Sequence, residues 1–198
     1  MIIVGASGHG KCVFDVLEDK GAVEAFYDDN PRSEIFMGKP VHLLGDPIPW
    51  KGKKDGFIAV GNNADRMKLA LRLEAKLNFL TTLHSSVISS FNVSYGRGVV
   101  AMEGAIIKVG TVIGDHVIIN TGSSIDHDCI IGDYAHIAPQ STLCGNIEIG
   151  EGVMIGAGAV ILPGIKIGKW ATVGAGSVVH LNIPNGGKWI GDRGIIAK

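Results

Sequence analysis

A histidine stands between two aspartates in the stretch "TGSSIDHDC" at residues 121–129. A carboxylate beside an imidazole raises the basicity of the ring and selects its tautomer, which a general base near neutral pH requires. The alternative interpretation is a hydrated histidine in a turn. We predict that His127 is a general base held by a neighbouring carboxylate, and the fold around it has to be consistent with this role.

From residue 105 onward the sequence repeats every six residues. The third residue of each hexad is a branched aliphatic residue, thirteen times in succession. These positions are Ile107, Ile113, Ile119, Ile125, Ile131, Ile137, Leu143, Ile149, Ile155, Ile161, Ile167, Val173 and Val179. A period of six fits neither an α-helix nor one long strand. It is typical of a solenoid of short parallel strands whose aliphatic side chains stack from coil to coil.

This pattern resembles the left-handed β-helix of the hexapeptide-repeat acyltransferases, in which three hexads form one triangular coil of eighteen residues. On that basis Gly145 lies one coil from His127, where its backbone N–H would face an oxyanion beside the base. Ala157 and Ala175 form a column of small residues, along which a pantetheine arm would fit. The alternative for this column is that small residues merely suit turns. His136 lies half a coil from His127, on another side of the triangle.

Residues 1–80 lack the six-residue period and predict a Rossmann-like α/β domain, with residues 81–198 forming the β-helix. Strands are expected at 1–4, 23–29 and 56–63, and they alternate with helices at 12–17 and 64–78. The residues expected on the inner faces of these helices are Cys12, Val13, Val16 and Leu17 in the first, and Met67, Ala70, Leu71 and Leu77 in the second.

The ends of the three expected strands carry residues suited to a nucleotide. "GASGHG" follows the first strand, where backbone N–H groups at a helix N-terminus would face a phosphate. Asp28 and Asp29 end the second strand, and Gly61 ends the third. Parallel strands bring their carboxyl ends to one edge, so these loops predict a nucleotide site. A mere tight turn is the alternative for the glycine segment alone.

Composition excludes several classes of partner. Eighteen basic and nineteen acidic residues leave a net charge of −1, without the basic excess of nucleic-acid-binding proteins. No segment resembles a signal peptide or a membrane span, so we expect a cytoplasmic protein without membrane insertion. The three cysteines suit free thiols better than disulfides or zinc. Three histidines fall on different faces of the predicted triangle, so no metal site is expected: His116, His127 and His136.

The whole chain resembles the nucleotide-activated 4-amino-sugar N-acetyltransferases of the PglD and NeuD type. The resemblance rests on "GASGHGK", "YDD", "IAVGNN", "LHSS" and "INTGSSIDHDCIIGDYAHIAPQSTLCGNIEIG", in this order. It implies a homotrimer that acetylates a nucleotide amino sugar with acetyl-CoA by direct transfer. The alternatives are a sialic-acid O-acetyltransferase of the NeuD type and a non-catalytic hexapeptide-repeat binding protein. The motifs do not select the carrier among UDP, GDP and dTDP.

The resemblance also implies roles for individual residues. His127 matches the proton acceptor, Asp128 the acid that tunes it, and Gly145 the oxyanion N–H. The residues implied to contact acetyl-CoA are His136, Ala157 and Ala175. The residues implied to hold the nucleotide sugar are Ser7, Gly8, His9, Asp28, Asp29 and Gly61.

Two departures from the family limit this transfer. The acid after the base is Glu in some members and the shorter Asp128 here. The C-terminus reads "WIGDRGIIAK" where many hexapeptide acyltransferases end in a Gly-x-Pro-Ala-Lys-like motif, so contacts of this tail with CoA are not carried over.

Overall fold

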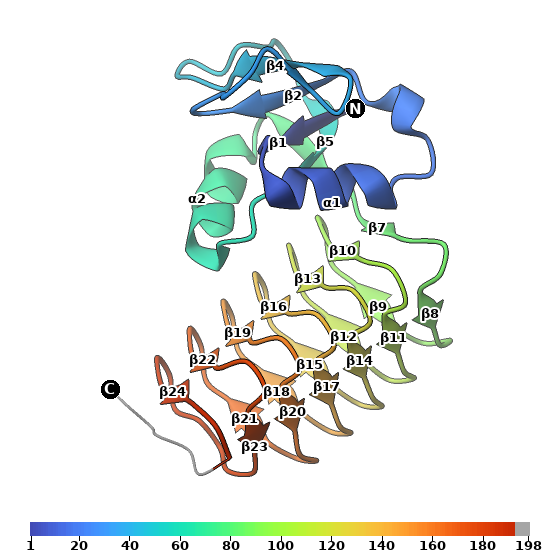
Figure 1. Cartoon of the computed structure of the whole chain (residues 1–198), viewed down its shortest axis with the longest axis vertical. Helices are drawn as coiled ribbons and strands as arrows, with labels where there is room; N and C mark the ends of the chain where they lie inside the picture. The colour runs from blue at the N-terminus through green and yellow to red at the C-terminus, as the bar shows by residue number, and fades with distance from the viewer. Residues whose placement is uncertain (193–198) are drawn as a thin grey trace.

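The computed structural model describes residues 1–192 and shows a small α/β part on one end of a long solenoid (Figure 1). The α/β part has a six-stranded sheet in the order β3-β4-β2-β1-β5-β6, in which only the β3–β4 pair is antiparallel. Its elements are β1 (Ile2–Val4), α1 (Gly8–Val16), a 3-10 turn (Lys20–Ala22), β2 (Ala25–Asp28), β3 (Ile35–Phe36), β4 (Lys39–Leu43), β5 (Lys54–Ile58), α2 (Asn63–Leu73) and β6 (Leu77–Phe79).

The solenoid has three faces, and each face is one parallel sheet (Figure 1). The first face contains β7 (Thr82–Leu83), β10 (Val100–Ala101), β13 (Ile118–Ile119), β16 (His136–Ile137), β19 (Met154–Ile155), β22 (Thr172–Val173) and β24 (Lys188–Trp189). The second face contains β8 (Ile88–Ser89), β11 (Ile106–Ile107), β14 (Ser124–Ile125), β17 (Thr142–Leu143), β20 (Val160–Ile161) and β23 (Val178–Val179). The third face contains β9 (Ser94–Tyr95), β12 (Val112–Ile113), β15 (Ile130–Ile131), β18 (Glu148–Ile149) and β21 (Lys166–Ile167).

Turns between the faces form three corners that run along the solenoid. The first corner follows the first face and includes 121–122, 139–140, 157–158 and 175–176. The second corner follows the second face and includes 109–110, 127–128, 145–146 and 163–164. The third corner follows the third face and includes 97–98, 115–116, 133–134, 151–152 and 169–170.

Strand pairing confirms the predicted coil of eighteen residues, because Ile125 pairs with Leu143 in the next coil. All thirteen aliphatic positions of the hexads point inward and are at most 3% exposed. Burying one such side chain contributes roughly 1.5–3 kcal/mol, so the repeated position supplies most of the driving force for this part. The predicted architecture, an α/β domain followed by a hexapeptide-repeat β-helix, is therefore confirmed.

The α/β part packs on the first face near the start of the solenoid. Val13 and Phe14 of α1 share one hydrophobic core with Val100 of β10 and Ile118 of β13. We propose the domain boundary between residues 80 and 81, which is supported by the end of β6 at Phe79 and the start of β7 at Thr82. Among residues 1–192, neither α1 nor α2 is long and apolar enough to cross a membrane.

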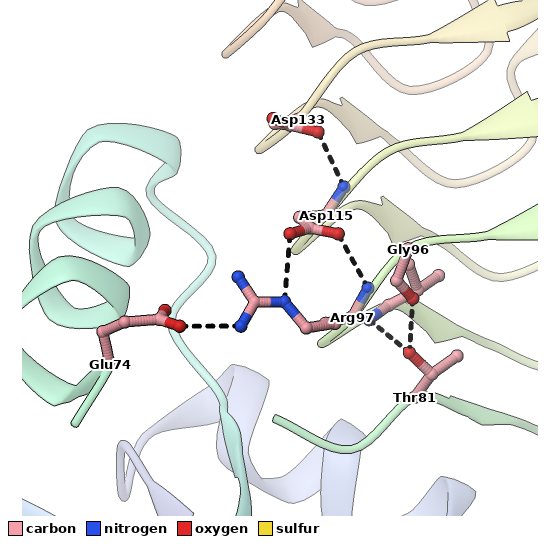
Figure 2. Close-up of polar contacts among 7 residues, drawn as sticks. Glu74, Thr81, Gly96, Arg97, Asp115 and Asp133 are labelled. Atoms are coloured by element: carbon pink, nitrogen blue, oxygen red, sulfur yellow. Dashed lines mark hydrogen bonds and ion pairs between the residues drawn. The ribbon is translucent and has the colours of Figure 1, made fainter. Parts of the chain in front are cut away.

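An exposed polar chain also joins α2 to the third corner (Figure 2). Glu74, next to the end of α2, accepts a hydrogen bond from Arg97 at 2.7 Å, and Arg97 Nε donates to Asp115 at 3.2 Å. The carboxylates of Asp115 and Asp133 each accept a backbone N–H one coil below, from Arg97 and Asp115 respectively, at 2.8 Å. Exposed ion pairs contribute little stability, so the hydrophobic core carries most of the contact between the two parts.

Two expectations for the helix faces were wrong. Cys12 is exposed, whereas Val13, Val16 and Leu17 face inward as expected. In α2, Leu71 is exposed, and the buried side chains include Arg66, Ala70 and Leu73. The helix also ends at Leu73, before the expected residue 78, so Leu77 is buried as part of strand β6 and not of the helix. The helix is rotated from the phase predicted by its aliphatic residues, because a buried Arg66 finds carbonyl acceptors around its guanidinium.

Candidate active site

His127 and Asp128 occupy the second corner, and their side chains are exposed and in contact. His127 Nδ1 lies 2.9 Å from Asp128 Oδ2, so the shorter acid still reaches the ring. This hydrogen bond, the largest cause, together with the charges of both neighbouring aspartates raises the pKa of His127 above its usual range. Asp128 has φ +57°, a left-handed conformation that Asp adopts more readily than most residues. The turn therefore holds the carboxylate beside the imidazole.

The other flanking carboxylate has a different role. Asp126 Oδ1 accepts the backbone N–H of His127 at 2.8 Å and so stabilises the turn. Of the two aspartates that drew attention in the sequence, Asp128 is the one that bonds the ring, and Asp126 shapes the backbone beneath it.

Two glycines in the same corner make room for the His127–Asp128 pair. A Cβ on Gly145, one coil above, would lie 2.5 Å from Cε1 and Nε2 of His127. A Cβ on Gly110, one coil below, would collide with the carboxylate of Asp128. Within residues 1–192 the backbone N–H of Gly145 has no hydrogen-bond acceptor. Sequence reasoning missed Gly110, although it stands eighteen residues before Asp128 and the coil period points to it.

His136 lies away from this corner, on the first face beneath the α/β part. Its side chain is 9% exposed, and its ring centroid lies 6.4 Å from that of His9. Burial is the main cause that lowers the pKa of both histidines to about 4. The structure thus brings His136 together with His9, one of the expected nucleotide-sugar residues, and not with the alanine column.

The tautomer of His136 follows from its hydrogen bonds. Asn120 Oδ1 accepts the backbone N–H of Thr121 at 2.8 Å, so Asn120 Nδ2 faces His136 Nε2 at 3.1 Å and donates to it. The proton of the neutral ring is therefore on Nδ1. This buried Nδ1–H makes no well-formed hydrogen bond within residues 1–192, and the nearby backbone carbonyl of Gly61 partly offsets the lowering of the His136 pKa.

Ala157 and Ala175 are exposed in the first corner, as the coil period predicts. Gly176 donates its N–H to the carbonyl of Ala157 at 2.8 Å, so the two alanines stack in adjacent coils. One whole face of the prism separates this column from His127 and Gly145 in the second corner. A single chain does not bring the base and the column of small residues to one point.

The loops at the carboxyl edge of the α/β sheet meet as predicted. Ser7 precedes α1 and makes no side-chain capping bond, and Gly8 begins the helix. Asp28 uses both carboxylate oxygens within the fold, because it accepts the N–H groups of Ala6 and Asn30 at 2.8 Å. It therefore holds the glycine loop against the end of β2.

Asp29 and Gly61 lie on the same edge. Asp29 pairs with Arg72 of α2 at 3.0 Å. A small hollow of about 140 Å³ lies at this edge and is lined by Val4, Gly5, Asp28, Asp29, Leu44, Val60 and Leu69. A hollow of about 340 Å³ beside it is lined by Ala6, Ser7, Gly8, Lys11, Arg32, Ser33 and Phe36. Its two cations suit a phosphate, and sequence reasoning missed both Lys11 and Arg32.

The thiol of Cys129, next to the second corner, is a poor nucleophile. Cys129 is fully buried, its Sγ donates to the carbonyl of Cys144 at 3.2 Å, and burial raises the pKa of its thiol.

No group of three histidine, cysteine or acidic residues within 1–192 is arranged to hold a metal ion. The C-terminal residues 193–198, which include most of the tail that departs from the family, lie outside the described residues.

Comparison with known families gives two matches along the chain. Residues 1–73 match the PglD N-terminal domain. Residues 110–145 and 146–180 match the bacterial transferase hexapeptide repeat, which is consistent with a left-handed β-helix. The first match lies within the α/β part and the second lies within the solenoid.

Several characterised proteins are similar to this chain. UDP-N-acetylbacillosamine N-acetyltransferase of Bacillus subtilis (strain 168) is 39% identical over 114 residues, which is 50% of each protein, so the alignment spans half of that relative. PerB from Caulobacter crescentus, solved in complex with CoA and GDP-perosamine, is 34% identical with a TM-score of 0.89, over 100% of this chain and 96% of PerB.

The acetyltransferase domain of PglB from Neisseria gonorrhoeae FA1090 is 30% identical with a TM-score of 0.90, over 99% of this chain and 98% of that one. It has also been solved in complex with acetyl coenzyme A. The resemblance predicted from the sequence motifs is confirmed over essentially the full length. The chain belongs to the family of hexapeptide-repeat sugar N-acetyltransferases that carry a PglD-type N-terminal domain.

Proposed function

We propose that the protein transfers an acetyl group from acetyl-CoA to the amino group of a nucleotide-activated amino sugar. The observation that carries this proposal is the His127–Asp128 pair beneath Gly145, in a chain similar over its full length to a protein solved with CoA and GDP-perosamine. The α/β part supplies the nucleotide-sugar site and the solenoid supplies the acetyl-CoA site. The proposed location is the cytoplasm, since the three free cysteines suit a reducing compartment.

The reaction is a direct transfer. The neutral sugar amine attacks the thioester carbonyl, and the tetrahedral intermediate carries its negative charge on the former carbonyl oxygen. Nε2 of His127 removes a proton from the attacking nitrogen, while Nδ1–H donates to Asp128 and stabilises the imidazolium that forms. The Gly145 N–H donates to the oxyanion. When the tetrahedral intermediate collapses, the new C–N bond is kept and the C–S bond breaks. The CoA thiolate then takes the proton from His127.

The proposed site lies between copies of the chain in a homotrimer. The base and the alanine column occupy different corners, so a neighbour has to bring the second corner of one chain to the first corner of the next. Apolar side chains are exposed along the second corner and the adjoining faces, including Phe91 at 82% exposure. These are Ile88, Phe91, Val109, Val112 and Ile130. Such a patch is typical of a surface that another chain covers.

Mixed trimers test the shared site. His127→Ala removes the base, and Ala175→Trp blocks the alanine column, so each variant alone is expected to be inactive. When the two are refolded together, some trimers pair an intact base with an intact column, and activity returns. A mixture that remains inactive while ultracentrifugation confirms mixed trimers would show that each chain carries its own site.

The reaction is tested with purified protein, acetyl-CoA and amino sugars carried on UDP, GDP and dTDP. Release of free thiol with one of these substrates, and an amide in the product by mass spectrometry, is the expected result. An ester product would identify an O-acetyltransferase instead. Absence of thiol release and of acetyl-CoA binding by calorimetry would favour a non-catalytic binding protein.

A further inference from the structure

Arg66 of α2 is a buried guanidinium in the contact between the two parts of the chain. Its side chain is 1% exposed, and no carboxylate within residues 1–192 forms an ion pair with it. Burial lowers its pKa to about 10, so the group remains charged near neutral pH. A buried charge without a counter-ion is costly unless its donors are satisfied, and here they all face oxygen acceptors.

On one side the guanidinium holds the loop that follows β5. Arg66 Nη1 donates to the carbonyls of Val60 at 3.0 Å and Gly61 at 3.2 Å. β5 ends at Ile58, so this loop has no strand partner at these residues. Gly61 is one of the residues that the family resemblance assigns to the nucleotide sugar.

On the other side the guanidinium is anchored on the solenoid. Nε donates to the carbonyl of His116 at 2.9 Å, and Nη2 donates to the carbonyl of Tyr134 at 2.7 Å. The second acceptor of Nη2 is Asn63 Oδ1 at 2.9 Å, and Asn63 in turn donates to the carbonyls of Gly152 and Val153 at 3.1 Å. The solenoid backbone here is already fixed by hydrogen bonds between coils. One example is the bond from the Tyr134 N–H to the backbone carbonyl of Asp115, at 2.8 Å. The solenoid side of this contact is therefore rigid, and Arg66 restrains the Val60–Gly61 loop against it.

We propose that Arg66 is a positioning residue that sets the Val60–Gly61 loop in place for the nucleotide sugar by tying it to the third corner. This inference rests on the proposed function. The planar fork of arginine donates in several fixed directions at once, whereas a lysine ammonium on a flexible stem does not reproduce that arrangement. The charge of Arg66 also lowers the pKa of both buried rings, after burial for His136, and after burial and the neighbouring His136 for His9.

Arg97 offers a matched control, because it too joins α2 to the third corner. It is exposed and bonds Glu74 and Asp115 (Figure 2). Within residues 1–192, none of its side-chain hydrogen bonds goes to the Val60–Gly61 loop. If substitution only weakens the contact between the two parts, variants of both arginines are expected to show the same change. If the change acts through the Val60–Gly61 loop, only variants of Arg66 are expected to show it.

The test compares Arg66→Lys and Arg97→Lys in steady-state kinetics with both substrates. Hydrogen bonds to charged groups contribute roughly 1.5–3 kcal/mol, so Arg66→Lys is expected to raise the KM of the nucleotide sugar about 10- to 100-fold. The KM of acetyl-CoA stays near the wild-type value, and Arg97→Lys leaves both unchanged. Equal KM values for the sugar in the two variants would overturn the proposal. An inactive wild-type protein would instead refute the proposed function.

A second variant covers the case in which Arg66→Lys does not fold. Arg66→Ala leaves a space of the right shape for free guanidinium, and the ion is expected to lower the KM of the sugar towards the wild-type value. The same concentration of guanidinium added to Arg97→Ala is the control. Recovery of thermal stability by guanidinium without recovery of the KM would show that Arg66 has a structural role only.

Discussion

The second corner and the contact between the two parts use histidine in opposite ways. At the second corner His127 is exposed beside Asp128, and its pKa is raised. Beneath the α/β part His9, His116 and His136 are largely buried near a cationic arginine, and burial lowers each pKa to about 4. A carboxylate in an open turn makes the ring a stronger base, whereas burial keeps it neutral. The environment of each histidine, and not its residue type, therefore determines which ring is suited to act as the proposed base.

Replacing His127 with Ala tests the exposed member of this comparison and is expected to have the largest effect. Turnover should fall roughly 10² to 10⁴-fold, the usual contribution of a positioned general base, while acetyl-CoA binding changes little. Steady-state kinetics and calorimetry measure the two quantities. Near-normal turnover in this variant would move the base assignment to another residue.

Gly145→Ala tests whether the space above the ring matters. The added Cβ would lie 2.5 Å from the His127 ring, so either the ring or the coil has to move. A displacement near 1 Å costs about 10²-fold in rate, and we expect a loss of that order. Gly145 is not among the glycines with positive φ, so the added methyl group acts through its contact with the ring and not through backbone strain.

The buried histidines predict a loss of stability in acid. Their folded pKa values are near 4 and the ordinary value is 6.5, so the unfolded chain takes up protons first as the pH falls. Stability is full above about pH 6.5 and declines towards pH 4, by at most about 3 kcal/mol for each histidine.

Urea unfolding at several pH values between 7 and 4.5 measures this slope. His136→Asn should flatten it, even if the variant is less stable throughout, whereas His127→Ala should leave it unchanged. His127 has the opposite sign, because a raised pKa stabilises the fold at low pH, and this exposed ring contributes little. A slope that is the same in His136→Asn and wild type would contradict the assignment of the acid effect to the buried rings.

Asp128→Asn is expected to have the smallest effect on rate. The amide retains one oxygen near the ring but removes the charge that raises the pKa of His127. Turnover should fall by about 10-fold, less than for His127→Ala. The acid limb of the pH–rate profile should move to lower pH, since the base now loses its proton more readily. A shift to higher pH would mean that another group controls this limb.

The six-residue period by itself determined the solenoid, its coil length and the column that places Gly145 above His127. It does so because each coil repeats one local arrangement, and every aliphatic position meets the same position of the next coil. The Asp-His-Asp turn is also local, although the structure was needed to distinguish Asp128, which bonds the ring, from Asp126, which bonds the backbone.

The contacts between the α/β part and the solenoid depend on the tertiary fold and could not be predicted from the sequence. Residues 66 and 134 are far apart in sequence, and no period links α2 to the third corner. The phase of α2 follows from the acceptors that surround Arg66, so a rule based on aliphatic residues placed Leu71 inside. The α/β part also covers His136, whose ring lies beside that of His9. The fold of one part determines which side of the other is covered, and local sequence carries no record of that contact.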